Sequence, residues 1–123
     1  MHEIITSFKK ALNGLEEALG MKPTDIIRDA SIQRFEFSVE LAWKSTQKFL
    51  RTQNVECNSP KSCMKEAFKF GLIQDDPLWV QMMDDKNLTV HTYDEATAEK
   101  IYKRLPSYIP LLKKLLEAIQ DGL

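Results

Sequence analysis

The sequence has few of the residues that form phosphate loops, metal centres and disulfide frameworks. Its 123 residues include only four glycines, two histidines and two cysteines. It has no Gly-rich phosphate loop, and no Gly-Ser is followed by the paired Asp-x-Asp that binds metal in nucleotidyl transfer. A structural zinc site needs about four closely spaced ligands, which these residues do not supply. We therefore expect no metal site and no nucleotidyl transfer by this chain alone.

The two cysteines, Cys57 and Cys63, lie in one short stretch of a chain that has enough apolar residues for its own core. Disulfide frameworks are typical of small secreted chains. The segment from Met1 to Lys10 lacks the basic flank, apolar stretch and cleavage site of an export signal. The sequence therefore predicts two free thiols.

Charge and hydropathy indicate neither a membrane protein nor a strongly charged partner. The 17 basic and 18 acidic residues leave a formal net charge of -1, so any anion-binding site must be local. No apolar run approaches the roughly 20 residues that span a bilayer. We expect a single cytoplasmic domain over residues 1–123.

Apolar residues recur every three or four positions at the start of the chain, which is the period of a helix with one buried face. Gly20 is expected to end this helix in a left-handed conformation. Thr24 is the expected N-cap of a long helix over residues 25–53. The buried face of the first helix consists of Ile4, Ile5, Phe8, Leu12, Leu15 and Leu19.

The helix predicted over residues 25–53 has two apolar faces. One extends from Ile32 through Phe35 to Leu50. A helix that is apolar on two sides must be covered on both, so we expect it at the centre of a bundle and at a subunit interface. The second face consists of Ile26, Ile27, Ala30, Phe37 and Leu41.

Two helices should follow, the first of them short, and each is opened by an N-cap residue and a proline. Ser59-Pro60 begins a helix that is expected to end at Gly71. Asp76-Pro77 begins another, which should continue to about Val90. Both starts place the proline where its missing N–H would have no helical partner.

Asp94 is the expected cap of the final helix, in which Pro106 and Pro110 predict a kink or a short break. No segment alternates apolar and polar residues as a half-buried strand does. The sequence therefore predicts an all-α fold, an antiparallel up-and-down helical bundle of four long helices and one short helix.

Residues 84–94 bring acidic, basic, amide, imidazole and phenol groups to a predicted helix end. On a continuous helix, Asp84, Asn87 and His91 would share one face. Lys86 lies about 140° from His91 around the axis, so the two would meet only if the helix unwinds or a second subunit supplies one of them. An imidazole beside a cation and an amide suits phosphodiester cleavage. The alternative is that His91 caps the helix end and Lys86 pairs with a neighbouring aspartate in solvent.

A second polar line follows the helix predicted over residues 25–53. Its members are Gln33, Glu36, Glu40 and Lys44. It is either one wall of a cleft or a solvated edge stabilised by the Glu40–Lys44 pair, which is spaced four residues apart. Trp43 and Trp79 are interpreted as core or interface aromatics rather than as platforms for stacking bases.

Two blocks of sequence, Ile32 to Lys44 and Asn87 to Glu95, resemble the nucleotidyltransferase substrate-binding protein family of the HEPN superfamily. The shorter matches Ser59-Pro60, Glu66-Ala67-Phe68 and Gly71-Leu72-Ile73 extend the resemblance over nearly the whole chain. It implies a dimeric bundle that pairs with a separately encoded minimal nucleotidyltransferase as its substrate- or nucleotide-binding half.

This resemblance implies that the chain alone binds no cofactor, and that ATP or another nucleotide binds with Mg²⁺ in the partner complex. The residues expected at the substrate are Gln33, Glu36, Glu40, Asn87 and His91.

HEPN relatives in toxin–antitoxin pairs are ribonucleases with an Arg, four to six residues and then a His, followed two residues later by a Tyr that the partner modifies with AMP. The matching positions are Lys86, His91 and Tyr93, with Asn87 after the basic residue. Lysine at position 86 departs from the pattern because it lacks the two-pronged guanidinium that grips a phosphate. Two functions therefore remain open, a binding subunit and a ribonuclease that acts on RNA.

Overall fold

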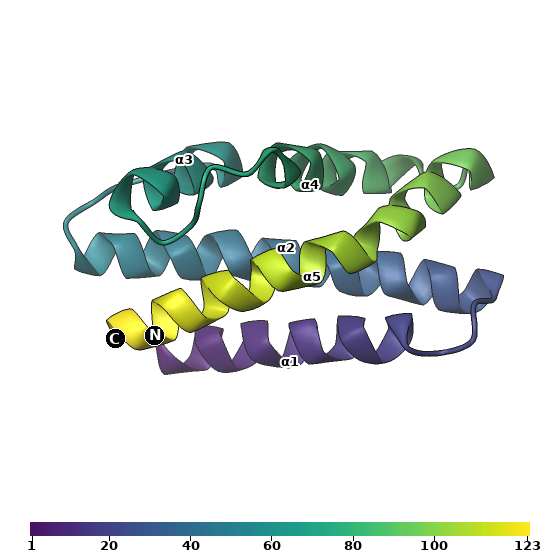
Figure 1. Cartoon of the computed structure of the whole chain (residues 1–123), viewed down its shortest axis with the longest axis horizontal. Helices are drawn as coiled ribbons and strands as arrows, with labels where there is room; N and C mark the ends of the chain where they lie inside the picture. The colour runs from purple at the N-terminus through teal and green to yellow at the C-terminus, as the bar shows by residue number, and fades with distance from the viewer.

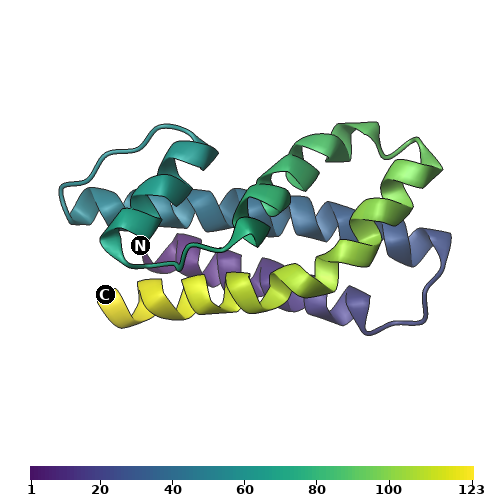
Figure 2. The ribbon, with the colours of Figure 1, turned by 45° about the horizontal axis from the view of Figure 1, so that its top comes forward.

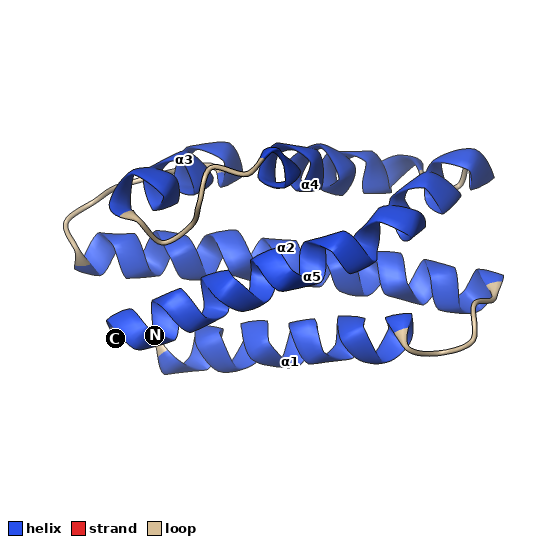
Figure 3. Cartoon of the chain, in the orientation of Figure 1, coloured by secondary structure: helices blue, strands red, loops and turns tan.

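Helix boundaries follow the capping residues of the sequence. The computed structural model describes residues 1–123 and contains no strand. Side-chain oxygens of Thr24, Ser59, Asp76 and Asp94 accept hydrogen bonds from backbone N–H groups in the first turn of the next helix. These bonds satisfy donors that a helix start otherwise leaves free. The elements are α1 (His2–Leu19), α2 (Asp25–Thr52), α3 (Pro60–Phe70), α4 (Pro77–Leu88), the 3₁₀ turn η1 (Thr89–His91) and α5 (Glu95–Gly122) (Figures 1 and 3).

Two glycines end helices in different ways. Gly71 follows α3 with a φ of 96°, the left-handed conformation that glycine adopts without steric cost. Gly20 follows α1 with a φ of -82°, so the predicted left-handed end is wrong there. Its backbone N–H donates to the carbonyls of Glu16 and Glu17, and these bonds close the last turn without a left-handed residue.

The central helix is α2, which contacts each of the other four α-helices. In Figure 1, α1 lies on one side of α2, α3 and α4 lie on the other, and α5 crosses in front. Both termini lie at the same end of the bundle (Figures 1 and 2). α3 and α4 have 11 and 12 residues, whereas α2 and α5 have 28 each. The all-α helical bundle is confirmed.

The two prolines of α5 bend the helix but do not interrupt it. Pro106 and Pro110 lie inside a helix assigned without a break from Glu95 to Gly122. Its ribbon changes direction in the yellow-green stretch of Figure 2, as expected where proline removes backbone donors and crowds the preceding turn. No helix of the chain, α5 included, is long and apolar enough to cross a lipid bilayer.

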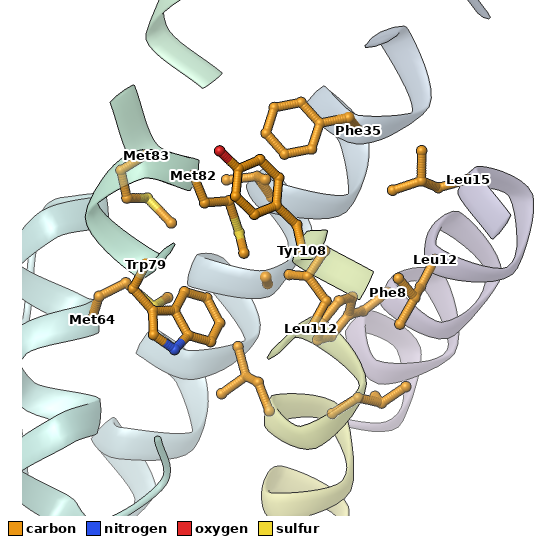
Figure 4. Close-up of a cluster of buried hydrophobic side chains, with 14 of the residues drawn as sticks. Phe8, Leu12, Leu15, Phe35, Met64, Trp79, Met82, Met83, Tyr108 and Leu112 are labelled. Carbon is orange, nitrogen blue, oxygen red and sulfur yellow. The ribbon is translucent and has the colours of Figure 1, made fainter. Parts of the chain in front are cut away.

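The core lies where the apolar faces of the helices meet. Phe35 of α2 and Tyr108 of α5 are completely buried, and their stacked rings have centroids 5.6 Å apart. Figure 4 shows them between Phe8 of α1 and the α4 side chains. Trp79 is 6% exposed and belongs to this core, whereas Trp43 is partly buried against it. The interpretation of Trp79 as a core aromatic is therefore confirmed.

The second apolar face of α2 is not covered within the chain. Ile26 is 80% exposed and Phe37 is 52% exposed, and the other three members are only partly buried. The bundle therefore buries one face of α2 and leaves the other at the surface. Burial of this second face at a subunit interface stays a prediction.

The prediction of two free thiols is wrong, because Cys57 and Cys63 form a disulfide. Ser59 and Pro60 turn the chain back onto the start of α3, and the two Cα atoms are 5.0 Å apart. Both cysteines are buried, and Gln47 of α2 donates a hydrogen bond to the Cys57 carbonyl. The bond therefore closes a short loop that is also fastened to α2.

Replacing both cysteines by alanine should lower the free energy of unfolding by about 2 kcal/mol, because the unfolded chain regains the freedom of an open loop. Urea denaturation followed by circular dichroism measures this change. Reductant should destabilise the wild type by a similar amount and leave the double variant unchanged. Equal stability of the wild type with and without reductant would contradict the prediction.

Candidate functional site

The end of α4 is tightened by threonine side chains. The α-helix ends at Leu88, two residues before the expected end, and residues 89–91 form the 3₁₀ turn η1. The Thr89 hydroxyl donates to the Lys86 carbonyl and the Thr92 hydroxyl to the Thr89 carbonyl. A 3₁₀ turn has three residues per turn instead of 3.6. The condition for the expected shared face of Asp84, Asn87 and His91, a helix that continues to His91, is therefore not met.

Two predicted candidates from different helices, Glu40 and Lys86, form an ion pair. Lys86 Nζ lies 3.6 Å from Glu40 Oε2. Glu40 also pairs with Lys44 at 3.0 Å and accepts a hydrogen bond of 3.1 Å from the Trp43 indole N–H. The hydrogen bond from Lys44 lowers the pKa of Glu40, although partial burial opposes this effect. The expected pairing of Lys86 with a neighbouring aspartate is replaced by this link from α4 to α2.

The other members of the polar line on α2 do not join this group. Gln33 is exposed and Glu36 is partly buried. Neither side chain is hydrogen-bonded to Lys86, Asn87 or His91. Within one chain, only Glu40 of the polar line meets the residues at the end of α4.

His91 and Tyr93 form a pair of their own. The His91 Nδ1 atom and the Tyr93 hydroxyl oxygen are 3.3 Å apart, and the two rings meet edge to face with centroids 5.9 Å apart. Both side chains are exposed, and Tyr93 is exposed by 83%. Within one chain, no hydrogen bond joins the His91 side chain to Lys86 or to a helix carbonyl. A reagent from solvent can reach the Tyr93 hydroxyl.

Lys86 and Asn87 line a hollow where α4 passes the start of α3. Its volume is about 270 Å³, and its other lining residues are Ser59, Pro60, Lys61 and Met83. His91 is not among them. The predicted site residues therefore divide into two groups, a hollow containing Lys86 and Asn87 and the exposed pair of His91 and Tyr93. A cation and an amide at the hollow suit the recognition of an anion.

A buried polar network that the sequence analysis missed holds this end of α4. Asp85 is 1% exposed and binds Arg104 of α5 at 2.8 Å. Tyr108 of α5 donates hydrogen bonds to Asp85 and to Gln81, the latter at 3.1 Å. Burial, followed by the hydrogen bond to Asp85, raises the pKa of Tyr108 well above its ordinary value. The only signal in the sequence is that Asp85 lies three residues after the core residue Met82, on the buried face of α4.

The chain has no cluster suited to a metal ion. No three side chains of His, Cys, Asp or Glu lie close enough together to hold one. The carboxylates near the site are instead paired with cations, Glu40 with Lys44 and Lys86, and Asp85 with Arg104.

Comparison with known proteins gives consistent matches over most of the chain. Residues 3–121 match the family described as nucleotidyltransferase substrate binding protein like. A Haemophilus influenzae protein named "Probable ribonuclease HepT" is 33% identical over 102 residues, which cover 79% of this chain and 70% of that protein.

Two solved structures share the fold. A Thermus thermophilus protein has a TM-score of 0.86 and 40% identity, with 91% of this chain and 98% of that chain covered. A Haemophilus influenzae protein, described as revealing the fold of a substrate binding domain of a nucleotidyltransferase, has a TM-score of 0.83 and 28% identity, with 94% and 98% covered.

Replacing Tyr108 by phenylalanine should lower the free energy of unfolding by about 1–3 kcal/mol at pH 7, because Asp85 loses a buried donor. The raised pKa means that the native chain holds the phenol proton more tightly than the unfolded chain, whose tyrosine pKa is about 10. This contribution is complete below pH 10 and is lost as the pH rises further. Urea denaturation at pH 7 and above pH 10 should therefore show a deficit that shrinks at alkaline pH. A deficit that is independent of pH would contradict the prediction.

Proposed function

The chain belongs to the nucleotidyltransferase substrate binding protein family, and from this premise we propose that it is the non-catalytic substrate- or nucleotide-binding subunit of a separately encoded minimal nucleotidyltransferase. The match over residues 3–121 carries the proposal. The absence of a Gly-Ser and Asp-x-Asp motif supports it, because a partner must then supply the catalytic metal site.

The hollow at Lys86 and Asn87 is the proposed contact with the substrate. Lys86 can offer an ammonium group to a phosphate, and the Asn87 side-chain NH₂ can donate a hydrogen bond to it. Lys86 Nζ lies 3.6 Å from Glu40 Oε2, and this solvent-accessible pair keeps the ammonium group near the hollow in the free chain. The partner's carboxylates would hold Mg²⁺ and ATP, or another nucleotide, at the point where the two proteins meet.

We place a second copy of the chain on the uncovered face of α2. Ile26 and Phe37 expose apolar area that water disfavours, and a homodimer would bury it. Such pairing would also bring polar groups of α2, Gln33 and Glu36 among them, to an interface. The role of these two residues at the substrate stays a prediction.

When the chain is produced together with its nucleotidyltransferase, the two should purify as one complex that binds ATP–Mg²⁺. Lys86→Ala should weaken nucleotide binding by the complex about tenfold, because a charge-assisted hydrogen bond is lost. Isothermal titration calorimetry measures the affinity. Lys69→Ala removes an exposed lysine outside the hollow and should have no effect. A chain that never engages the enzyme, in pull-down or by light scattering, would refute the proposal.

A second candidate function is a HEPN ribonuclease toxin silenced by AMP on Tyr93. The relative named "Probable ribonuclease HepT", 33% identical, favours it. The exposed Tyr93 hydroxyl beside His91 suits modification by a partner. Within a single chain, Lys86 does not meet the pair of His91 and Tyr93. A ribonuclease site that uses Lys86 and His91 would therefore need groups from two copies of the chain.

Incubation with the partner and ATP–Mg²⁺ should add one adenylate to the chain if Tyr93 is the silencing target. Intact-mass analysis would detect it, and Tyr93→Phe should abolish the gain while Tyr102→Phe retains it. The ribonuclease function further requires that His91→Ala removes toxicity on expression. Toxicity that persists in His91→Ala would eliminate this second function.

A further inference from the structure

A groove between α3 and α4 lies beside the hollow and has not been assigned a role. Its volume is about 300 Å³, near the lower limit for small-ligand pockets. Six apolar side chains line it, with lysines and aspartates at its rim. The apolar lining consists of Met64, Phe68, Ile73, Trp79, Val80 and Met83.

The groove and the hollow adjoin each other, and together they are called the depression here. Lys61 and Met83 line both of them, and Lys86 and Asn87 line only the hollow. An apolar compartment therefore lies next to the cation and the amide of the candidate site.

The two ends of the depression differ in charge. Lys61 and Lys86 lie at the hollow, and Asp75 and Asp76 lie at the far end of the groove. Each of these lysines forms an ion pair with a carboxylate. Lys61 Nζ lies 3.7 Å from Asp84 Oδ1, and Lys86 Nζ lies 3.6 Å from Glu40 Oε2. Such pairs at a solvent-accessible surface contribute little free energy, so an incoming phosphate can replace the carboxylates.

Aromatic groups in the groove are suited to a planar partner. Phe68 is 48% exposed and presents part of its ring to the groove. Trp79 is largely enclosed by the chain, and its indole N–H donates no hydrogen bond within it. Aromatic side chains bind bases of any sequence by stacking on their faces. A nucleobase would therefore gain a stacking surface on Phe68 here.

We propose that the α3–α4 groove binds the base and ribose of a nucleoside phosphate whose phosphate reaches Lys61 and Lys86. This inference rests on the proposed function and names its substrate class. The aspartates at the far end would accept hydrogen bonds from amino or hydroxyl groups of the ligand. The small volume and the cation at one end favour a nucleotide over a helix of another protein, which would need a longer apolar surface.

Saturation-transfer NMR and calorimetry on the full chain with AMP, adenosine and inorganic phosphate would test this subsite. AMP should bind more tightly than either fragment, and its base protons should receive the strongest transfer. Phe68→Ala should weaken AMP binding about tenfold through lost stacking. Lys61→Ala should weaken the binding of AMP but leave that of adenosine unchanged. A short oligoadenylate, titrated separately, shows whether the same unit is accepted from RNA.

Matched controls exist on the same helix. Phe70 is a similarly exposed aromatic that packs against Phe49, and Lys69 is an exposed lysine, and neither lines the groove. Phe70→Ala and Lys69→Ala should retain AMP affinity. If circular dichroism shows that Phe68→Ala is unfolded, Val80→Asp at a 63% exposed position tests the same surface.

Three results would overturn the subsite. The first is that the wild type does not bind AMP. The second is that Phe68→Ala and Lys61→Ala both bind AMP with unchanged affinity. The third is that these variants lose binding of the nucleotidyltransferase but keep binding of AMP. The last would show that the groove docks a protein. A complex that forms and binds nucleotide normally despite groove substitutions refutes the subsite alone. AMP binding in the groove without any such complex supports the subsite and refutes the proposed function.

Discussion

The buried carboxylate of Asp85 constrains the rest of the candidate site. A charge removed from water costs several kcal/mol unless hydrogen bonds and an opposite charge compensate it. Arg104 and Tyr108 of α5 provide that compensation, so α4 cannot rotate or slide without exposing an unpaired charge in the core. The next two residues on α4, Lys86 and Asn87, are consequently directed toward α3 and α2. The network thus sets the geometry of the hollow without contacting what binds there.

Local chemistry made the helices predictable, and long-range pairing made the site harder to predict. Caps such as Thr24 and Ser59 act within three residues, so their signals are complete in the sequence. The disulfide and the Asp85–Arg104 pair depend on how the chain folds back, which composition and spacing do not encode. The helix expected to continue to about Val90 ends at Leu88, where threonine hydroxyls bond to carbonyls of the last turn.

Glu40 connects two groups that sequence reasoning treated separately. It belongs to the polar line of α2, yet it holds Lys86 from α4 and Lys44 from its own helix. The Glu40 carboxylate thus lies between two ammonium groups, one of which, Lys86, lines the hollow. The net charge of the chain is only -1, so this positive charge is a local feature. Any site for an anion would then be local, as the near-neutral composition predicts. The His91–Tyr93 pair stands apart from this arrangement and depends on a second polypeptide for any shared chemistry.

The two chain ends lie together at one end of the bundle, and the turn from α4 to α5 lies at the other (Figure 1). Termini that lie close together are a common feature of domains that tolerate insertion into another chain. This bundle can therefore be joined to an enzyme through either terminus while the turn from α4 to α5, at the opposite end, stays accessible. Joining this chain and the proposed nucleotidyltransferase in a single polypeptide would raise their effective concentration for each other, and the helices would not need to change.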